Sequence, residues 1–401
     1  MNTLDQRLVG NWNYPTSIRF GAGRIVELPG VCRETGMKSP LLVTDPGLAK
    51  MPMVLNALDD CKANGLECDL FYNIKTNPTG GNVADGLKAY REGGHDGVIA
   101  FGGGSGIDAG KAIAFMSGQD RPIWEFEDVG DNWRRANPSG IAPVVAVPTT
   151  SGTGSEVGRA AIITDTEHRV KKVIFHPRML PSIVMADPVL TIGLPRHLTA
   201  ATGMDALSHN LEAFCTPAYH PMAEGIALEG IRLIKEWLPK ACANGKDLEA
   251  RSHMMVASTM GATAFQRGLG AMHALAHPLG ALYDAHHGLL NAVFMPYVLC
   301  ANRPAIEELM IRLSRYLGLA NASFDAVLDW VMALRAEIGI PNSLSEIGID
   351  GKQASQVVRM ALADPSSGGN PAPLGADGYR EIFRRAVAGE LGWKARRGSS
   401  G

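Results

Sequence analysis

The sequence predicts an α/β domain built on a parallel sheet, followed by an all-α domain. In the first half of the chain, short continuous apolar runs alternate with helical stretches, which is typical of strands buried on both faces of a parallel sheet. Strand-like runs stop near residue 195, and beyond it apolar residues recur at helical spacing. Glycine makes up 46 of the 401 residues. This share exceeds the typical value of about 7% and favours many tight turns.

Three apolar runs are the strand candidates of the first half, and helical spacers lie between them, as βαβ units require. The strand candidates are residues 41–44, 98–101 and 143–147, and the spacers include 86–92 and 109–116. Residues 160–164 and 172–175 are joined by a polar turn. They predict a hairpin added to the same sheet.

The second half is predicted to be helical throughout. One apolar stripe shows the spacing clearly, with Ala227, Ile231, Leu233, Ile234 and Leu238 on one helix. We therefore place the α/β domain at residues 1–193 and the helical domain at 194–395. Residues 396–401 are treated as a tail.

The composition excludes several classes of protein. Lys and Arg number 38 against 40 Asp and Glu, so the chain lacks the basic excess of a nucleic-acid binder. No run approaches the ~18 uninterrupted apolar residues of a membrane span, and residues 1–7 lack the apolar segment of a signal peptide. The six cysteines form no CxxC pair and no disulfide framework. We expect a cytoplasmic protein with reduced thiols.

A glycine-rich loop, Gly102 to Lys111, follows the second strand candidate and opens a helix. Three consecutive glycines at the carboxyl end of a strand favour phosphate binding, because bare backbone N–H groups and the helix dipole both attract an anion. The loop is neither the GxGxxG fingerprint, since Ile107 replaces the third glycine, nor a Walker A loop, since Ala112 replaces its Ser or Thr. It predicts a ligand site at this strand end, in preference to a plain strand-to-helix turn.

A second loop of small and hydroxyl-bearing residues, 148–156, follows the third strand candidate. We expect it to line the other side of the same crevice. Asp45 ends the first strand candidate, where its carboxylate can accept hydrogen bonds from a ribose. Since a carboxylate there repels a 2′-phosphate, Asp45 favours NAD over NADP.

Histidine is concentrated in the helical half, where eight of the eleven lie between residues 197 and 287. Asp205 and His209 are four residues apart and so share one helix face. So many His and Asp residues in apolar segments would each need a buried partner. A divalent metal such as Fe(II), Zn or Mn accounts for them together. The spacing does not choose the remaining ligands, whose candidates are His273, His277, His286 and His287.

In order and spacing, four motifs resemble the iron-containing (group III) alcohol dehydrogenases. They are Gly102-Gly103-Gly104-Ser105-x-x-Asp108-x-x-Lys111, Pro148-Thr149-Thr150-x-Gly152-Thr153-Gly154-Ser155-Glu156, Gly203-Met204-Asp205-x-x-x-His209, and His273-x-x-x-His277-Pro278-x-Gly280 with His287-Gly288. The resemblance covers residues 11–391. It implies a Rossmann-like α/β nucleotide-binding domain with a parallel sheet, followed by an all-α metal-binding domain.

The resemblance also implies a role for each site residue. The metal, Fe(II) or alternatively Zn, is held by Asp205, His209, His273 and His287. His277 faces the nicotinamide and the catalytic cleft, whereas His286 receives no role. NAD is bound by Asp45, Asn77, Gly103, Gly104, Ser105, Asp108, Thr149, Thr150 and Lys172.

The implied reaction is hydride transfer between a small primary alcohol or diol and NAD(H), with the substrate oxygen on the metal as Lewis acid. We expect His277 and the ribose hydroxyls to carry the released proton outward. The implied partners are a small alcohol or aldehyde and further copies of the chain, as a homodimer or larger homo-oligomer.

Several alternatives stay open at this point. Arg267 lies in a segment one residue shorter than the commoner family pattern. It is either a helix-end residue or a contact for an anionic substrate, which leaves a short hydroxyacid or semialdehyde as an alternative substrate. Glycerol dehydrogenases and maleylacetate reductases share the architecture. A lyase of the dehydroquinate-synthase type and a non-catalytic relative are alternatives from other classes.

Overall fold

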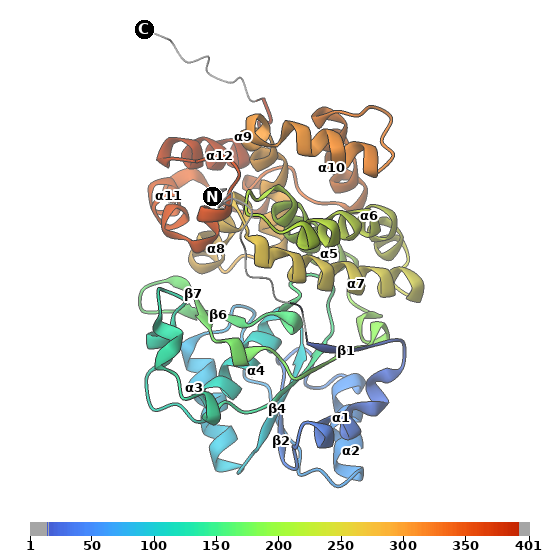
Figure 1. The fold of residues 1–401 in the computed structure, drawn as a ribbon, viewed down its shortest axis with the longest axis vertical. Helices are drawn as coiled ribbons and strands as arrows, with labels where there is room; N and C mark the ends of the chain where they lie inside the picture. Colours follow the sequence, from blue (N-terminus) through green and yellow to red (C-terminus); the bar gives the residue numbers. More distant parts are fainter. Residues whose placement is uncertain (1–13, 15, 393–401) are drawn as a thin grey trace, which may run out of the picture.

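The computed structural model describes residue 14 and residues 16–392, and it shows two halves stacked along the long axis (Figure 1). The strands of the described chain lie in the lower half, and the upper half is helical. The last strand, β8 (Ile183–Ala186), and the first helix of the upper half, α5 (Arg196–Cys215), flank the predicted boundary at residue 193. The predicted tail, 396–401, and residues 1–7 lie outside the described residues.

The lower half is organised by a six-stranded parallel sheet with the order β1-β8-β5-β4-β2-β3. Its other strands are β1 (Ser17–Phe20), β2 (Pro40–Val43), β3 (Asp69–Phe71), β4 (Gly97–Gly102) and β5 (Val144–Pro148). The three predicted strands are confirmed as β2, β4 and β5. After β3 the chain crosses back over β2 to form β4, so the strand order reverses between β2 and β4. Ligands of parallel α/β sheets bind at the carboxyl ends of the strands at such a point.

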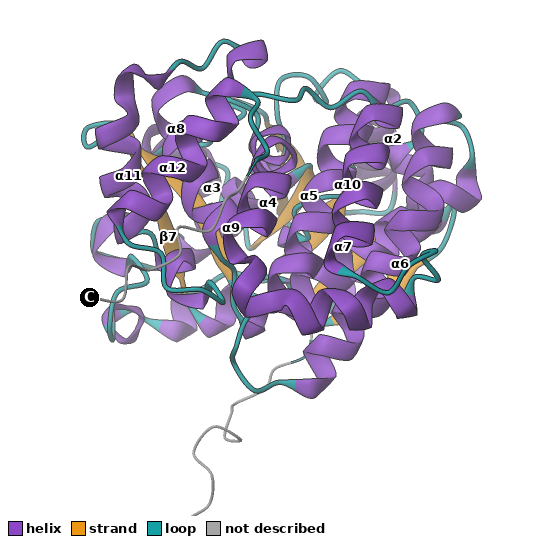
Figure 2. Ribbon diagram, turned by 90° about the horizontal axis from the view of Figure 1, so that it is seen from above, coloured by secondary structure: helices purple, strands orange, loops and turns teal. Residues whose placement is uncertain are grey.

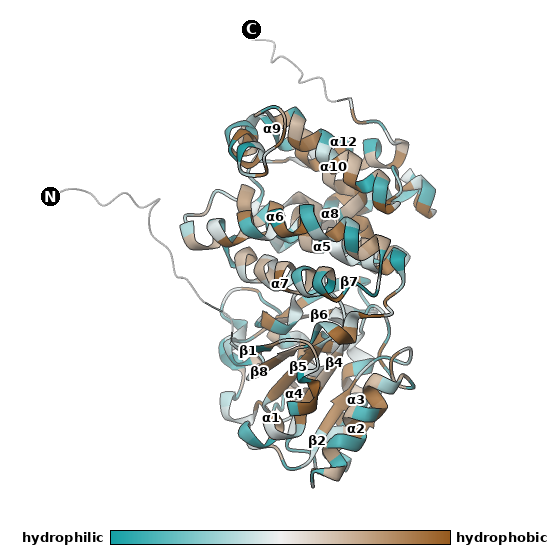
Figure 3. Cartoon of the chain, turned by 90° about the vertical axis from the view of Figure 1, so that its right-hand side faces the viewer, coloured by the Kyte–Doolittle hydropathy of each residue, from teal (hydrophilic) through white to brown (hydrophobic). Residues whose placement is uncertain are grey.

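Helices cover both faces of the sheet, which explains the continuous apolar runs. Neighbouring side chains of a strand point to opposite faces, so Leu41 and Val98 join one core and Leu42 and Ile99 the other. The first core includes α3 (Gly80–Glu92) and α4 (Gly104–Met116), and the second includes α1 (Leu28–Glu34) and α2 (Pro52–Ala63). Figure 3 shows the apolar central strands between these helices.

The predicted hairpin exists, but it does not extend the main sheet. Strands β6 (Ala160–Asp165) and β7 (Val170–Phe175) pair with each other in an antiparallel sheet of their own. Their apolar residues Ile163 and Ile174 join the core that contains α4. The hairpin therefore covers α4 and reaches the helical half, where β7 contacts α8.

The upper half is a helical bundle with α5 at its centre (Figures 1 and 2). The other helices are α6 (Pro221–Ala243), α7 (Leu248–Ala264), α8 (Ala271–Tyr283), α9 (His287–Tyr316), α10 (Phe324–Ile338), α11 (Ala354–Ala363) and α12 (Ala376–Ala388). The apolar stripe predicted on one helix is buried on α6. Helix α5 is buried along most of its length, because α6, α7 and α9 pack around it. Among the described residues, no helix is long and apolar enough to cross a membrane.

Candidate metal centre and cofactor crevice

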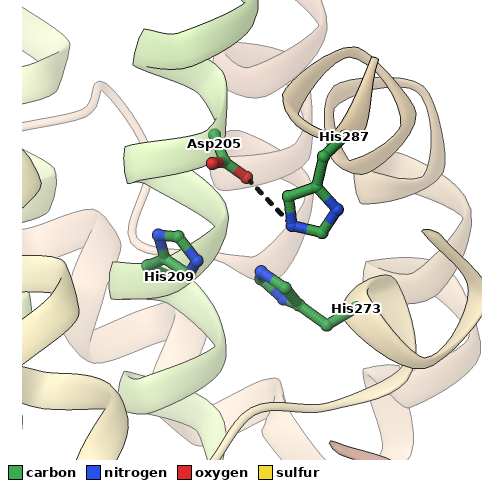
Figure 4. Close-up of side chains that lie close together, drawn as sticks. All are labelled: Asp205, His209, His273 and His287. Atoms are coloured by element: carbon green, nitrogen blue, oxygen red, sulfur yellow. Dashed lines mark ion pairs between the residues drawn. The ribbon is translucent and has the colours of Figure 1, made fainter. Parts of the chain in front are cut away.

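Four side chains from three helices converge in the upper half (Figure 4). Asp205 and His209 lie one turn apart on α5, His273 lies in the first turn of α8, and His287 begins α9. One donor atom from each side chain lies within 4.8 Å of the others. Three imidazoles and one carboxylate suit Fe(II) or Zn. The structure thus brings together the four residues that the resemblance implies, whereas His286 lies outside this group.

Backbone and side-chain acceptors fix the orientation of two of these imidazoles. Nδ1 of His209 lies 3.2 Å from the carbonyl oxygen of Gly152, and Nδ1 of His273 lies 2.7 Å from Oε2 of Glu212. An Nδ1–H that donates to a fixed acceptor leaves the lone pair on Nε2. Both rings therefore present Nε2 as a ligand atom. Nδ1 of His287 is buried and has no partner among the described residues.

The charge states follow from burial and from one carboxylate. Burial lowers the pKa of His209 to about 4 and that of His287 well below its ordinary value, so both are neutral near pH 7. Burial also opposes protonation of His273, but the facing Glu212 outweighs it and raises the pKa of His273. Neutral imidazole is the form that binds a metal.

Glu212 is a residue that the sequence analysis missed. It lies on α5 one turn beyond His209 and is buried. Besides His273, it accepts hydrogen bonds from the backbone N–H groups of Gly270 and Met272, at 2.8 and 2.7 Å. It therefore caps the amino end of α8 and orients a candidate ligand at once. The spacing of Asp205, His209 and Glu212 on one helix face was the available sequence signal.

Asn291, one turn into α9, contacts three of the four candidate ligand atoms. Its Nδ2 lies 2.9 Å from Oδ1 of Asp205, 3.1 Å from Nε2 of His273 and 3.2 Å from Nε2 of His287. One amide carries two hydrogens and cannot satisfy three acceptors. The convergence of acceptor atoms on one point, among buried side chains, fits a bound cation.

His277 lies beside this cluster. It follows His273 by one turn of α8, and its ring stacks on that of His287 with centroids 5.3 Å apart and an interplanar angle of 11°. Its Nδ1 lies 2.8 Å from Oδ2 of Asp364. Burial alone raises the pKa of Asp364, but His277 and a hydrogen bond from the Ser366 backbone outweigh it, and the pKa of Asp364 is lowered.

Asp45 and the glycine-rich loop, both predicted to bind the cofactor, follow the carboxyl ends of β2 and β4, and we call this region the cofactor crevice. Asp45 follows β2, and its Oδ1 accepts from the N–H groups of Gly47 and Leu48 at 2.8 and 3.1 Å, which fixes the turn. Gly103 precedes α4 and offers no side-chain cap to the first N–H groups of this helix, which suits an anion at this end. A Cβ on Gly102 would lie 3.8 Å from Oδ2 of Asp45, which shows that the two strand ends are adjacent.

The second loop packs directly on the first. The Thr149 N–H donates to the Gly102 carbonyl at 2.9 Å, and a Cβ on Gly103 would meet Thr150 at 3.4 Å. A Cβ on Gly104 would lie 2.5 Å from Thr153, so only glycine fits there. Because the same loop carries the Gly152 carbonyl that holds His209, it connects the crevice to the metal centre.

Two further predicted residues lie at the edge of the crevice. The Asn77 side chain donates to Oδ1 of Asp284 at 2.5 Å, across the boundary between the two halves. The Ser105 hydroxyl donates to the carbonyl of Thr76. The loop that precedes α3 is therefore joined to both α4 and α8.

The carboxylate of Asp108, another predicted cofactor residue, has three contacts within the protein. Its Oδ1 accepts from the Ser155 hydroxyl at 2.5 Å and lies 3.2 Å from Nζ of Lys111, while Oδ2 accepts from the Ile162 N–H at 2.9 Å. Three internal contacts make Asp108 a brace between α4, the second loop and β6. Its role as a cofactor contact stays a prediction.

The ammonium group of Lys172 is engaged within the protein. It lies 3.1 Å from Asp165 and 3.6 Å from Glu127, on the face of β7 that also carries Ile174. Neighbouring strand residues point to opposite faces, and Lys171 instead reaches α8, where a Cβ on Gly280 would lie 2.8 Å from its Nζ. Burial lowers the pKa of Lys171 to about 8. Lys171 is thus the better candidate for a cofactor contact.

The structure also decides between the alternatives for Arg267. Its side chain is only 8% exposed and donates to the carbonyl groups of Ala213, Phe214 and Ala218, while Nη2 lies 3.2 Å from Glu224. All three of its nitrogens are engaged, so Arg267 caps the end of α5 and does not offer a contact for a substrate anion.

His286, which received no predicted role, directly precedes α9. Its Nδ1 accepts from the Leu289 N–H at 3.3 Å and so caps the helix.

Comparisons with known proteins agree with this arrangement. The model of the iron-containing alcohol dehydrogenase family matches residues 15–188, and that of the Fe-containing alcohol dehydrogenase family, C-terminal, matches residues 199–387. The chain is 38% identical to 4-hydroxybutyrate dehydrogenase of Cupriavidus necator, over 93% of this chain and 99% of that protein. It is 31% identical to NAD-dependent methanol dehydrogenase of Bacillus methanolicus, over 94% of this chain and 100% of that protein. A crystal structure of 1,3-propanediol oxidoreductase superposes with a TM-score of 0.89 at 36% identity. The match covers 94% of this chain and 100% of that protein.

Proposed function

The chain belongs to the iron-containing alcohol dehydrogenase family, and from this premise we propose how its residues divide the work of the reaction. It is an NAD-dependent, metal-dependent alcohol dehydrogenase. The observation that carries the site assignment is the convergence of four donor atoms within 4.8 Å of one another, linked by the second loop to the crevice. When bound, the metal supplies a Lewis acid that lowers the pKa of an alcohol, and NAD supplies the hydride acceptor.

Asp205, His209, His273 and His287 are the proposed metal ligands. The Gly152 carbonyl and Glu212 hold the Nδ1–H tautomers of His209 and His273, so that Nε2 of each is available without rearrangement. The low pKa values of His209 and His287 keep both rings neutral. The site is thereby preorganised for a divalent cation.

The crevice is the proposed NAD site. The uncapped N–H groups at Gly103 to Ser105 bind the pyrophosphate, and Asp45 accepts from the ribose. Thr149 and Thr150 line the nicotinamide side, next to the metal centre. Asn77 and Lys171 close the crevice from the side of α8.

His277 is the proposed proton carrier. It contacts the rings of His273 and His287 without joining the four candidate ligands. With Nδ1 held by Asp364, its Nε2 is the atom that accepts the proton released when the alcohol ionises.

The proposed substrate is a small primary alcohol or diol. The second candidate is a short ω-hydroxyacid, which the similarity to 4-hydroxybutyrate dehydrogenase favours. Arg267 does not favour it, because its nitrogens are engaged within the protein.

A homo-oligomer in the cytoplasm is also part of the proposal. The six described cysteines are free and buried, as in a protein of a reducing compartment.

An anaerobic assay of NADH formation tests the function. Primary alcohols, diols and ω-hydroxyacids are supplied to Fe(II)-loaded, Zn-loaded and metal-free protein. We expect metal-dependent NADH formation with at least one class, and its absence throughout would favour the lyase-type or non-catalytic alternative.

Lys171→Ala and Lys172→Ala form a matched pair for the cofactor site. Only Lys171→Ala should weaken NADH binding, measured by fluorescence titration. An equal effect of both variants would refute the assignment of Lys171, and not Lys172, to the cofactor site.

A further inference from the structure

Asp364 joins two parts of the helical half that are distant in sequence. It lies directly after α11 and precedes a short 3-10 turn, Pro365–Gly369. Its Oδ1 accepts from the Ser366 N–H at 2.9 Å and so fixes that turn, while Oδ2 faces Nδ1 of His277 at 2.8 Å. The Asp364 side chain is 10% exposed and that of His277 is 14% exposed. The pair is therefore largely shielded from water.

The segment that carries Asp364 is fastened to α8 at a second point. Asn370, at the end of the turn, accepts from the Ala271 N–H at 3.1 Å, at the start of α8. Asn370 is itself held by a reciprocal pair of hydrogen bonds with Asn302, at 2.8 and 2.9 Å. The Thr216 hydroxyl donates to the Gly369 carbonyl. Anchored at both ends, the segment holds the Asp364 carboxylate at a fixed position along α8.

The carboxylate determines which nitrogen of His277 carries the proton. An ionised carboxylate accepts but does not donate, so only the Nδ1–H tautomer forms a hydrogen bond across the 2.8 Å contact. The other tautomer would direct its lone pair at the carboxylate. The stacking on His287 meanwhile fixes the plane of the ring. In the neutral ring, the lone pair therefore lies on Nε2 of His277.

The neighbouring histidine of α8 is held in the same way. Glu212 faces Nδ1 of His273 at 2.7 Å, just as Asp364 faces Nδ1 of His277. Two rings one helical turn apart are thus each oriented by a buried carboxylate from a different element. In one case the oriented Nε2 belongs to a candidate metal ligand, and in the other to the candidate proton carrier.

We infer that Asp364 is a positioning residue of the reaction, which holds His277 in the Nδ1–H tautomer so that Nε2 is ready to take the substrate proton. The inference rests on the proposed role of His277. It assigns to Asp364 no contact with substrate or cofactor. Its action on turnover passes through His277.

The test compares Asp364→Asn with a matched surface variant. Asparagine keeps an oxygen for the Ser366 N–H but presents an amide to His277, which permits the Nε2–H tautomer. We expect kcat to fall about 10–100-fold, with metal content and the KM for NAD unchanged. Asp377→Asn makes the same chemical change at a fully exposed side chain at the start of α12 and should leave kcat unaltered. Wild-type kcat in Asp364→Asn would overturn the inference.

A spectroscopic readout does not depend on turnover. In the Zn-loaded full chain with ¹⁵N-labelled histidine, the ring nitrogens of His277, assigned with His277→Gln, should show the Nδ1–H tautomer. The Asp364→Asn variant should lose it. An Nε2–H ring in the wild-type protein would refute the inference even if the variant fails to fold. If His277→Ala itself leaves turnover intact, the proposed role of His277 fails; if only Asp364→Asn does, the positioning role alone fails.

Discussion

Replacing Glu212 with glutamine tests how the metal centre is preorganised. The carboxylate accepts three hydrogen bonds, from Gly270, Met272 and His273. Glutamine retains one oxygen and introduces an NH2 group. Placed at the position of Oε1, the NH2 group faces the Met272 N–H; placed at Oε2, it faces the Gly270 N–H. In either orientation one buried donor loses its acceptor.

The expected losses of stability and of metal affinity follow from these contacts. An unsatisfied buried donor costs about 1–3 kcal/mol, so the free energy of unfolding of the metal-free protein should fall by about that amount. In the second orientation the NH2 group also donates to Nδ1 of His273, which moves the ring proton to Nε2 and removes the lone pair needed by a metal. Loss of such an outer partner weakens metal affinity about 10–100-fold. That range corresponds to about 1.4–2.7 kcal/mol.

The assay is competition for Zn between the protein and a chromophoric chelator, together with urea unfolding of the metal-free protein. Glu249→Gln, on the exposed first turn of α7, makes the same chemical change without a buried partner and serves as the control. Zn affinity of Glu212→Gln equal to that of Glu249→Gln and wild type would refute the reasoning. It would show that Glu212 caps α8 without orienting His273.

Three further predictions follow from the structure. Removing the metal with a chelator should abolish NADH formation. Adding the metal back at about 1,000 times its Kd should raise the free energy of unfolding by about 4 kcal/mol. An unchanged Tm would contradict a metal site built into the fold. Gly154→Ala should lower the free energy of unfolding by about 2–5 kcal/mol, because φ is +61° and the new Cβ would lie 2.1 Å from that of Ala262. Gly65→Ala, with φ of +80° and open space, should cost only about 1–2 kcal/mol, and equal losses would refute the packing argument. Arg267→Met should destabilise the protein by about 2–4 kcal/mol without changing the ratio of kcat/KM for alcohols to that for hydroxyacids, and a tenfold change in that ratio would restore a substrate role.

Three of the four inner strands of the main sheet were predicted because their signal is local, whereas the equally buried β8 was missed. Strands β2, β4 and β5 are buried on both faces and therefore appear as continuous apolar runs. Edge strands β1 and β3 have three or four residues, partly exposed, and carry no such signal. The hairpin was predictable as a pair, but its separation from the main sheet depends on packing against α4.

The motif residues of the site were visible in the sequence. Which face of a strand or helix each side chain occupies was not always visible. Lys171 and Lys172 are adjacent, and only the pairing of β7 decides which of them points to α8. Arg267 lies beside the predicted pocket motif, yet its donors are taken by the end of α5. A resemblance places a residue in the right segment, whereas the tertiary contacts decide what its side chain meets.

The sequence by itself determined the α/β-then-α order, the glycine-rich loop at a strand end and the concentration of His and Asp in the helical half. These features depend on composition and on spacings of a few residues, which backbone geometry converts directly into strands, turns and helix faces. Only the tertiary structure identified Asp364 and Asn291, and it gave Glu212 its role. Glu212 and Asp364 act on histidines 61 and 87 residues away, and Asn291 lies 86 residues from Asp205. Such partners are set by how separate helices pack, and no local pattern encodes that packing.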